Sequence, residues 1–293
     1  MIFVHDKGRM ANNMLQYGHL YAWGREHRRQ TMSMRFAYKY PWFHICDTPH
    51  HNFLTYVFAK YAAKWGWIPT VRFDEEKADY SKDEQLMLTK KLIVAAGWNA
   101  RWYDLFLKYK SEILQLFAFH DDVEQHADQI MKECGDLKLG VHIRRGDYKT
   151  FYDGRFYFSD EQYVNIIQRF LALNPGKKVS VLICGNDPKL DRSYYEEKLP
   201  DCQVVFPDGH PAEDLCVLSH CDYLIGAPST FSLVAAMYHD VPLYWIEDAE
   251  AFLTVDSFQH FDTLFRHIYS GIIRSCVMRS MYCWIMAFSS RSI

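Results

Sequence analysis

The second half of the chain alternates short apolar runs with longer segments in which apolar residues recur at helical spacing. The apolar runs predict strands at residues 137–143, 179–184, 202–206, 223–225 and 242–246. The segments between them predict helices at residues 159–172, 188–198, 211–219 and 230–239. Because strands that alternate with helices pair in parallel, this half predicts a parallel sheet covered by helices on both faces.

The N-terminus begins with the same arrangement. Residues 2–4 predict a strand, residues 7–9 a tight turn and residues 10–28 a helix with an apolar face. A strand, a glycine-containing turn and a helix form the start of a βαβ unit. From about residue 45 to residue 132 the pattern is mostly helical and specifies no order of elements.

The extent of the second alternating series sets the predicted domain boundaries. We predict an N-terminal domain at residues 1–132, a second domain at residues 133–262 and a helical tail at residues 263–293. The apolar positions of the tail fit one face of an amphipathic helix: Ile272, Ile273, Cys276, Val277, Met281, Trp284 and Ile285. Because no acidic residue follows Asp262, this helix is expected either to pack against the domains or to lie on an anionic membrane surface.

Composition narrows the class of protein. With 293 residues, 49% of them hydrophobic and 16% aromatic, the chain can bury more than one core. A net charge of −3 provides no broad positive field, which argues against nucleic acid as a partner. The eight cysteines form no C-x-x-C pair and are expected to be reduced core residues. The short apolar run at the N-terminus predicts no signal peptide, so we expect a cytoplasmic protein, peripheral to the inner face of the membrane if the tail lies on the bilayer.

Two adjacent arginines follow the predicted strand 137–143. They belong to residues 142–148, His-Ile-Arg-Arg-Gly-Asp-Tyr, and lie where an open α/β sheet holds a phosphorylated ligand. A guanidinium keeps its charge and grips two phosphate oxygens at once, so the pair predicts a diphosphate clamp. Since neighbouring side chains on a strand point to opposite faces, we expect one arginine to bind phosphate and the other to brace the loop. The alternative is that Arg144 and Arg145 are solvated residues of a polar turn.

A second loop of small and hydroxyl residues follows the predicted strand 223–225. Ser229 or Thr230 can cap the next helix while its free N–H groups face an anion. Helix capping alone is the alternative. Because the two loops follow neighbouring strands, they are expected to converge on one crevice.

Three further polar positions are weaker candidates for nucleotide binding. Asn186 and Asp187 follow the strand 179–184 and would bind a ribose or a base, or cap the following helix. Asp214, with Glu213 beside it, would accept hydrogen bonds from a guanine edge, although carboxylates in the first turn of a helix are also expected from the helix dipole alone.

Several chemistries lack their motifs. There is no Asp-x-Asp and no H-E-x-x-H, so we predict no metal and no cofactor, and a diphosphate neutralised by protein charge. The absence of G-x-S-x-G and of G-x-x-x-x-G-K-[ST] argues against a serine hydrolase and a P-loop enzyme.

Three segments resemble one enzyme family. Residues 142–148 resemble the signature of the α-1,2-fucosyltransferases of glycosyltransferase family 11 and, more loosely, that of α-1,6- and protein O-fucosyltransferases. Residues 8–17 are similar to the family's N-terminal glycine-rich turn, and residues 228–232 to its Ser-Thr-Phe-Ser block. The resemblance implies an α/β fold of the GT-B type, with two facing Rossmann-like domains, an acceptor-side N-terminal half and a C-terminal half that binds GDP-fucose without metal.

The resemblance also implies roles for individual residues. Arg145 would bind the β-phosphate, while Arg144 and His142 shape its loop. The residues that would surround the diphosphate and the sugar are Ser229, Thr230, Phe231 and Ser232. Arg9 and Asn12 would reach across the cleft to donor or acceptor. Asp147 is the first candidate for the catalytic base, with Asp6 and Asp153 as further candidates, and the alternative for Asp147 is a turn carboxylate that pairs with Arg144.

These implications give a specific functional prediction. The chain is expected to transfer L-fucose from GDP-fucose to a hydroxyl of an oligosaccharide acceptor with inversion, forming an α-1,2 linkage to galactose. The alternatives are a GT-B transferase that uses another nucleotide sugar, and a non-catalytic protein that binds a nucleotide sugar or a glycan.

Overall fold

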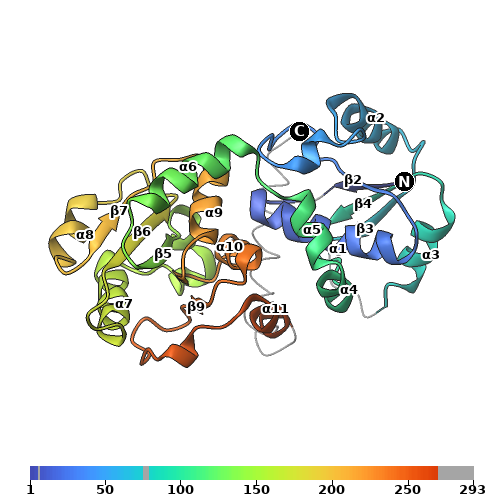
Figure 1. Ribbon diagram of the computed structural model, residues 1–293. Coiled ribbons are helices and arrows are strands. Elements are labelled where there is room, and N and C mark those ends of the chain that lie inside the picture. The colour runs from blue at the N-terminus through green and yellow to red at the C-terminus, as the bar shows by residue number, and fades with distance from the viewer. Residues whose placement is uncertain (6, 75–78, 270–293) are drawn as a thin grey trace. The chain divides into compact units, whose positions relative to one another are not determined.

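The computed structural model describes residues 1–5, 7–74 and 79–269, which form two compact α/β units (Figure 1). The first unit is Met1–His120 and the second begins at Asp121. The helix α6, Asp121–Lys132, belongs to the second unit because it packs against α9, Pro211–Ser219. The sequence prediction placed residues 121–132 in the first domain, since no local pattern shows which unit a helix packs on.

A four-stranded parallel sheet forms the centre of the first unit, in the order β2-β1-β4-β3. Its strands are β1 Ile2–His5, β2 Thr31–Ser33, β3 Thr70–Phe73 and β4 Ile93–Gly97. Its helices are α1 Met10–Glu26, α2 Phe53–Lys64, α3 Ser81–Thr89, α4 Tyr103–Lys108 and α5 Lys110–Leu116, with a 3-10 turn at His44–Asp47. The predicted strand, turn and helix at the N-terminus are confirmed.

The mostly helical pattern predicted for residues 45–132 is incomplete, because β3 and β4 lie within it. All five residues of β4, Ile-Val-Ala-Ala-Gly, are buried. A short run that is apolar on both faces has no period that separates a buried strand from a buried helix. The two strands therefore could not be recognised from the local pattern alone.

In the second unit, a five-stranded parallel sheet has the order β7-β6-β5-β8-β9. Its strands are β5 Leu137–Ile143, β6 Val179–Gly185, β7 Gln203–Val205, β8 Tyr223–Gly226 and β9 Leu243–Trp245. In addition to α6 and α9 its helices are α7 Asp160–Leu173, α8 Arg192–Lys198, α10 Thr230–His239 and α11 Phe261–Tyr269, with 3-10 turns at Gly146–Lys149, Phe151–Gly154 and Val255–Ser257. The parallel sheet predicted from the alternating pattern is confirmed.

Local chemistry explains several helix boundaries of this unit. α7 begins with a capping box, in which Ser159 accepts from the backbone N–H of Gln162 and the side chain of Gln162 accepts from that of Ser159. α8 begins at Arg192, later than the predicted residue 188, because the side chain of Asp191 caps it by accepting from the N–H of Tyr194.

The strand order places a topological switch point beside β5. From β5 the chain moves outward to β6 and β7 on one side, and it returns through α9 to β8 and β9 on the other side (Figure 1). The loops after β5 and β8 therefore both begin at the carboxyl end of the sheet and then run in opposite directions. In open α/β sheets, ligands bind in the crevice that this divergence creates.

The predicted tail, from residue 263, starts within the helix α11, which is described over Phe261–Tyr269. The predicted amphipathic face, from Ile272 to Ile285, lies outside the described residues. Within residues 1–5, 7–74 and 79–269, we find no helix with both the length and the apolar composition that a bilayer span requires.

Candidate functional site

Three loops of the second unit start at the carboxyl end of its parallel sheet. The register pairs Ile143 with Gly185 and His142 with Gly226, so β5, β6 and β8 end at one level. Arg145, Asn186 and Ser229 follow these ends by a few residues. The predicted convergence of the loops after β5 and β8 is confirmed, and the loop after β6 joins them.

Arg145 has a buried and fixed guanidinium, with 8% of its side chain exposed. Its Nη2 lies 2.6 Å from Oδ1 of Asp160, and its Nη1 donates to the hydroxyl of Tyr157 over 3.4 Å. The Tyr157 ring also stacks against it, with its centroid 5.0 Å from the guanidinium carbon. Nε is buried and has no hydrogen-bond partner among the described residues, so part of the guanidinium's donor capacity is unused.

A second layer of contacts holds Asp160 in place. The hydroxyl of Tyr195 donates to Oδ1 of Asp160 over 2.6 Å. Burial disfavours the charge of Arg145, but Tyr157 and Asp160 outweigh it and raise the pKa of Arg145 above its ordinary value. Arg145 therefore remains a cation. The sequence prediction missed Asp160, Tyr157 and Tyr195, because a carboxylate in the first turn of α7 is also expected from the helix dipole.

Arg144 points to a different partner. Its Nη2 lies 2.5 Å from Oδ1 of Asp147, and its guanidinium lies 5.1 Å from the ring centroid of Tyr148. This is the bracing contact expected of one of the two arginines, and it is also the turn pairing given as the alternative for Asp147. The role of Asp147 as catalytic base stays a prediction.

The loops after β5 and β8 are joined by two side-chain contacts. The Tyr148 hydroxyl donates to the backbone carbonyl of Pro228. His142 Nδ1 lies 2.8 Å from Oγ of Ser232, and the His142 ring centroid lies 4.8 Å from that of Phe231. Burial, and then the charge of Arg144, lower the pKa of His142 to about 3, so its imidazole is neutral.

Gly226 makes the contact between His142 and Ser232 possible. A Cβ at position 226 would lie 2.5 Å from the Ser232 Oγ, closer than two such atoms can approach. Ser229 begins α10, and its Oγ accepts from the N–H of Phe231. The predicted capping by Ser229 is thus observed, and Thr230 is the first helical residue. The other N–H groups of this first turn lack intrahelical acceptors and favour an anion in front of them.

Asn186 is bound to the backbone of Arg145. Its Oδ1 accepts from the Arg145 N–H over 2.8 Å, and its Nδ2 donates to the Arg145 carbonyl over 3.3 Å. The alternative role given for Asp187 was to cap the following helix, but the structure shows that it does not cap α8. Instead its Oδ1 accepts from the N–H of Lys189, and Asp191 caps the helix. Asn186 therefore positions the arginine loop, and the ribose or base contacts predicted for both residues stay predictions.

Asp214 lies in the first turn of α9, the helix that follows β7. Burial raises the pKa of its carboxyl to about 7, with a smaller contribution from neighbouring Glu213. Glu213 itself accepts from the backbone N–H of His210 over 2.7 Å in a capping box. Of the two carboxylates, Asp214 is the one not committed to the helix cap.

The candidates in the first unit follow β1. Gly8 has a φ of +92°, and a Cβ there would lie 2.5 Å from Nδ2 of Asn12, so the tight turn requires glycine. Arg9 is the exposed N-cap residue of α1. The roles predicted for Arg9 and Asn12 at the donor or acceptor stay predictions. Of the further base candidates, Asp6 lies outside the described residues, and Asp153 is exposed in a 3-10 turn.

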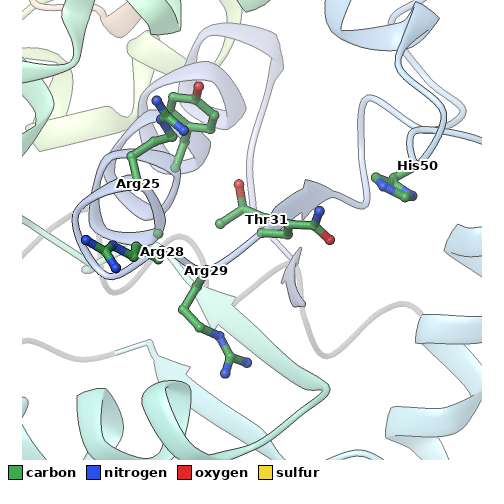
Figure 2. Close-up of a pocket in the computed structure, with 8 residues that line it drawn as sticks. Arg25, Arg28, Arg29, Thr31 and His50 are labelled. Carbon is green, nitrogen blue, oxygen red and sulfur yellow. The ribbon is translucent and has the colours of Figure 1, made fainter.

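A basic cavity of about 390 Å³ lies elsewhere in the first unit, between the end of α1 and β2. Figure 2 shows that its three arginines point in different directions. Arg25 pairs with Glu112 over 2.7 Å, and Arg29 donates to the carbonyl of Leu88 over 2.9 Å. Their charges do not converge on one point, so the cavity is not an anion site.

Comparison with known proteins identifies the family of the chain. The model of the family described as "Glycosyl transferase family 11" matches residues 1–240. The chain belongs to glycosyl transferase family 11. The family match ends just after α10, so it includes every candidate site residue of both units.

Mammalian galactoside fucosyltransferases are among the curated relatives of this family 11 chain. It is 24% identical over 247 residues to the galactoside 2-alpha-L-fucosyltransferase SEC1 of Bos taurus, a match that covers 80% of this chain and 63% of the bovine one. It is 24% identical over 246 residues to the galactoside alpha-(1,2)-fucosyltransferase 2 of Gorilla gorilla gorilla, covering 80% and 67%. The chain thus spans less than two thirds of the bovine relative.

Solved structures show the fold of the family 11 chain. A mutant of Arabidopsis thaliana FUT1 in complex with GDP has a TM-score of 0.62 at 12% identity, covering 88% of this chain and 73% of that one. POFUT1 in complex with GDP-fucose has a TM-score of 0.52 at 12% identity, covering 82% and 93%. The α-1,6-fucosyltransferase NodZ soaked with GDP-fucose has a TM-score of 0.52 at 13% identity, and the match covers 83% of this chain and 94% of that one. The predicted GT-B fold with Rossmann-like units is confirmed.

Proposed function

We propose that this chain transfers L-fucose from GDP-fucose to a galactose hydroxyl of a glycan acceptor, with inversion and formation of an α-1,2 linkage. Membership of family 11 and the names of its galactoside fucosyltransferase relatives support the reaction class. The observation that carries the proposal is Arg145, a buried cation held at the switch point of the second sheet, in a loop that Tyr148 joins to the loop before α10.

The geometry of Arg145 suits a diphosphate leaving group. Among the described residues, Asp160 accepts from Nη2 and Tyr157 from Nη1, so the remaining N–H groups, that of Nε among them, are left to meet phosphate oxygens. As the bond between fucose and the diphosphate breaks, its electron pair passes to the GDP oxygen, and negative charge grows there. A donor fixed before the reaction stabilises that charge without the cost of reorganising solvent.

The acceptor side of the reaction needs a base. The acceptor hydroxyl attacks the anomeric carbon, forms the new C–O bond and releases its proton to that base. Asp147 is our candidate, with Arg144 as the cation that orients it. We further propose that Arg145 and the first turn of α10 neutralise the diphosphate without a divalent cation.

A donor and acceptor screen tests the proposal. The purified chain is incubated with labelled GDP-fucose and a panel of galactose-terminated oligosaccharides, and the product is analysed by mass and by the position of its new linkage. GDP-mannose and UDP-sugars serve as donor controls, each with and without added Mg²⁺. A fucosylated product with an α-1,2 linkage supports the proposal. Preferred turnover of another donor, or binding of GDP without transfer to any acceptor, overturns it.

A further inference from the structure

A cluster of three metal-binding side chains lies between two helices of the second unit. Glu124 projects from α6, while Cys216 lies in α9 and His220 caps the C-terminus of that helix. One donor atom from each residue lies within 4.8 Å of the other two. The family 11 reaction described above uses none of these residues.

Two of the three donor–donor distances match the edges of a tetrahedral metal site. Cys216 Sγ and His220 Nε2 each lie 3.5 Å from Oε2 of Glu124. Tetrahedral zinc bonds of about 2.0–2.3 Å to oxygen, nitrogen and sulfur separate two donor atoms by about 3.3–3.7 Å. Both distances from Glu124 therefore fit a shared metal ion, and the donor atoms of Cys216 and His220 lie within 4.8 Å of each other.

His220 is oriented as metal-binding histidines usually are. Its Nδ1 lies 2.9 Å from the backbone carbonyl of Cys216, one helical turn earlier. An N–H at Nδ1 donates to this carbonyl and leaves the lone pair at Nε2, the nitrogen beside Glu124. Backbone carbonyls commonly fix the tautomer of histidine ligands in this way.

Access to the cluster is one-sided. Cys216 is fully buried, whereas 26% of the His220 side chain and 41% of that of Glu124 are exposed. A cavity of about 350 Å³ is lined by His220 together with Ser219, His239 and the loop that precedes β9. A metal ion and a water ligand can thus reach the cluster beside His220, while the thiol is shielded.

We infer that Glu124, Cys216 and His220 bind one zinc ion, with water as a fourth ligand, and that this ion clamps α6 to α9. Nitrogen, oxygen and sulfur donors in tetrahedral spacing favour zinc. On binding, the Cys216 thiol loses its proton to solvent and its sulfur forms the bond to the metal. The thiolate and the carboxylate then balance the two positive charges of the ion, and His220 binds as a neutral ligand.

The site is separate from the proposed transfer chemistry. Asp214 lies in the first turn of α9, after the loop that follows β7, whereas Cys216 lies further along the helix and His220 at its C-terminus. Zinc is therefore expected to stabilise the second unit and to take no part in the reaction at Arg145.

Metal binding by the full chain tests the inference. After chelation and dialysis the parent is expected to bind about one equivalent of Zn²⁺ that survives gel filtration. Co²⁺ in place of zinc is expected to give tetrahedral visible bands and a thiolate-to-cobalt charge-transfer band in the near ultraviolet. Zinc at about a hundredfold above its Kd is expected to raise the Tm of the second unit by about 5–10 °C.

Matched variants identify the ligands. Cys216→Ser and His220→Gln are expected to lose the bound equivalent, while Cys134→Ser, which removes another cysteine of this unit, keeps it. His120→Gln disrupts the exposed cluster of His44, Asp47 and His120 in the first unit and is expected to leave binding unchanged. Circular dichroism checks that each variant is folded.

Three outcomes overturn the inference. They are a parent that retains less than about a tenth of an equivalent, a cobalt spectrum without the thiolate band, and loss of binding in His120→Gln. The cobalt spectrum is measured on the parent, so the test stands even where a variant fails to fold.

Discussion

Arg145→Lys tests the contact on which the proposed function depends. The substitution keeps the positive charge but replaces a planar group of five donors with a single ammonium. In the parent, Nη2 donates to Asp160 and Nη1 to Tyr157, while Nε has no partner among the described residues, so the protein uses only part of the guanidinium's donors. A lysine ammonium at this position would pair with Asp160. The diphosphate leaving group would then lack the donor that Arg145 provides.

The size of the loss follows from the number of contacts removed. One preorganised donor to a developing oxyanion contributes about 2.7–4 kcal/mol, or about 10²–10³ in rate. We therefore expect kcat/KM for fucosyl transfer to fall by about 10²–10³, mostly through kcat, because the contact strengthens as the diphosphate leaves. Folding should be retained, since Asp160 keeps a cationic partner and Asn186 still binds the backbone at position 145.

Initial rates of transfer with varied GDP-fucose, measured on parent and variant, check this prediction. Arg144→Lys is the matched control, because that arginine lies in the same loop but is paired with Asp147. We expect the control to lose about tenfold or less, through a looser loop. A turnover of Arg145→Lys within about threefold of the parent, with circular dichroism unchanged, would remove Arg145 from the proposed role.

Three further predictions concern the surroundings of this contact. Asp160→Asn removes the charge that orients Arg145 and is expected to lower kcat/KM by about tenfold or more. In the double variant with Arg145→Lys the two losses in free energy should not add. Additive losses would show that the two residues act independently. Asp214 has its folded pKa raised from 3.8 to about 7, so its contribution to stability is complete below 3.8 and is lost as the pH rises through about 7. For Asp214→Asn, the free energy of unfolding measured in urea should not show this decline with pH. If the ionised carboxylate binds guanine, the parent's KM for GDP-fucose should fall from about pH 6 to about pH 8, while the KM of the variant stays constant. Gly226→Ala places a methyl group against Ser232 Oγ and breaks the contact between Ser232 and His142. We therefore expect the free energy of unfolding to fall by about 1–3 kcal/mol. An unchanged midpoint of urea unfolding would contradict this prediction.

The sequence predicted the sheet of the second unit and the position of its main cation. Both follow from local signals, namely alternating apolar runs and an arginine pair at the end of a strand. The different partners of Arg144 and Arg145, Asp147 and Asp160, also fit a local rule, that neighbouring side chains diverge. These parts of the molecule depend on residues close together in the chain.

The parts that escaped prediction depend on contacts between distant residues. Tyr195 supports Arg145 from 50 positions away through Asp160, and no spacing in the sequence links them. Asn186 was expected to bind a ribose or a base, or to cap the following helix, and nothing in the sequence indicated that its amide binds the backbone of the loop after β5. Glu124 and His220 likewise meet only because α6 packs on α9.

The two hydrogen bonds between Asn186 and the main chain of Arg145 also bear on attempts to change the proposed nucleotide donor. An amide that holds backbone atoms cannot be exchanged freely, whichever nucleotide is wanted. Under the predicted guanine contact of Asp214, libraries that aim at a new base are better directed at the first turn of α9, where substitutions leave the hydrogen bonds of Asn186 in place.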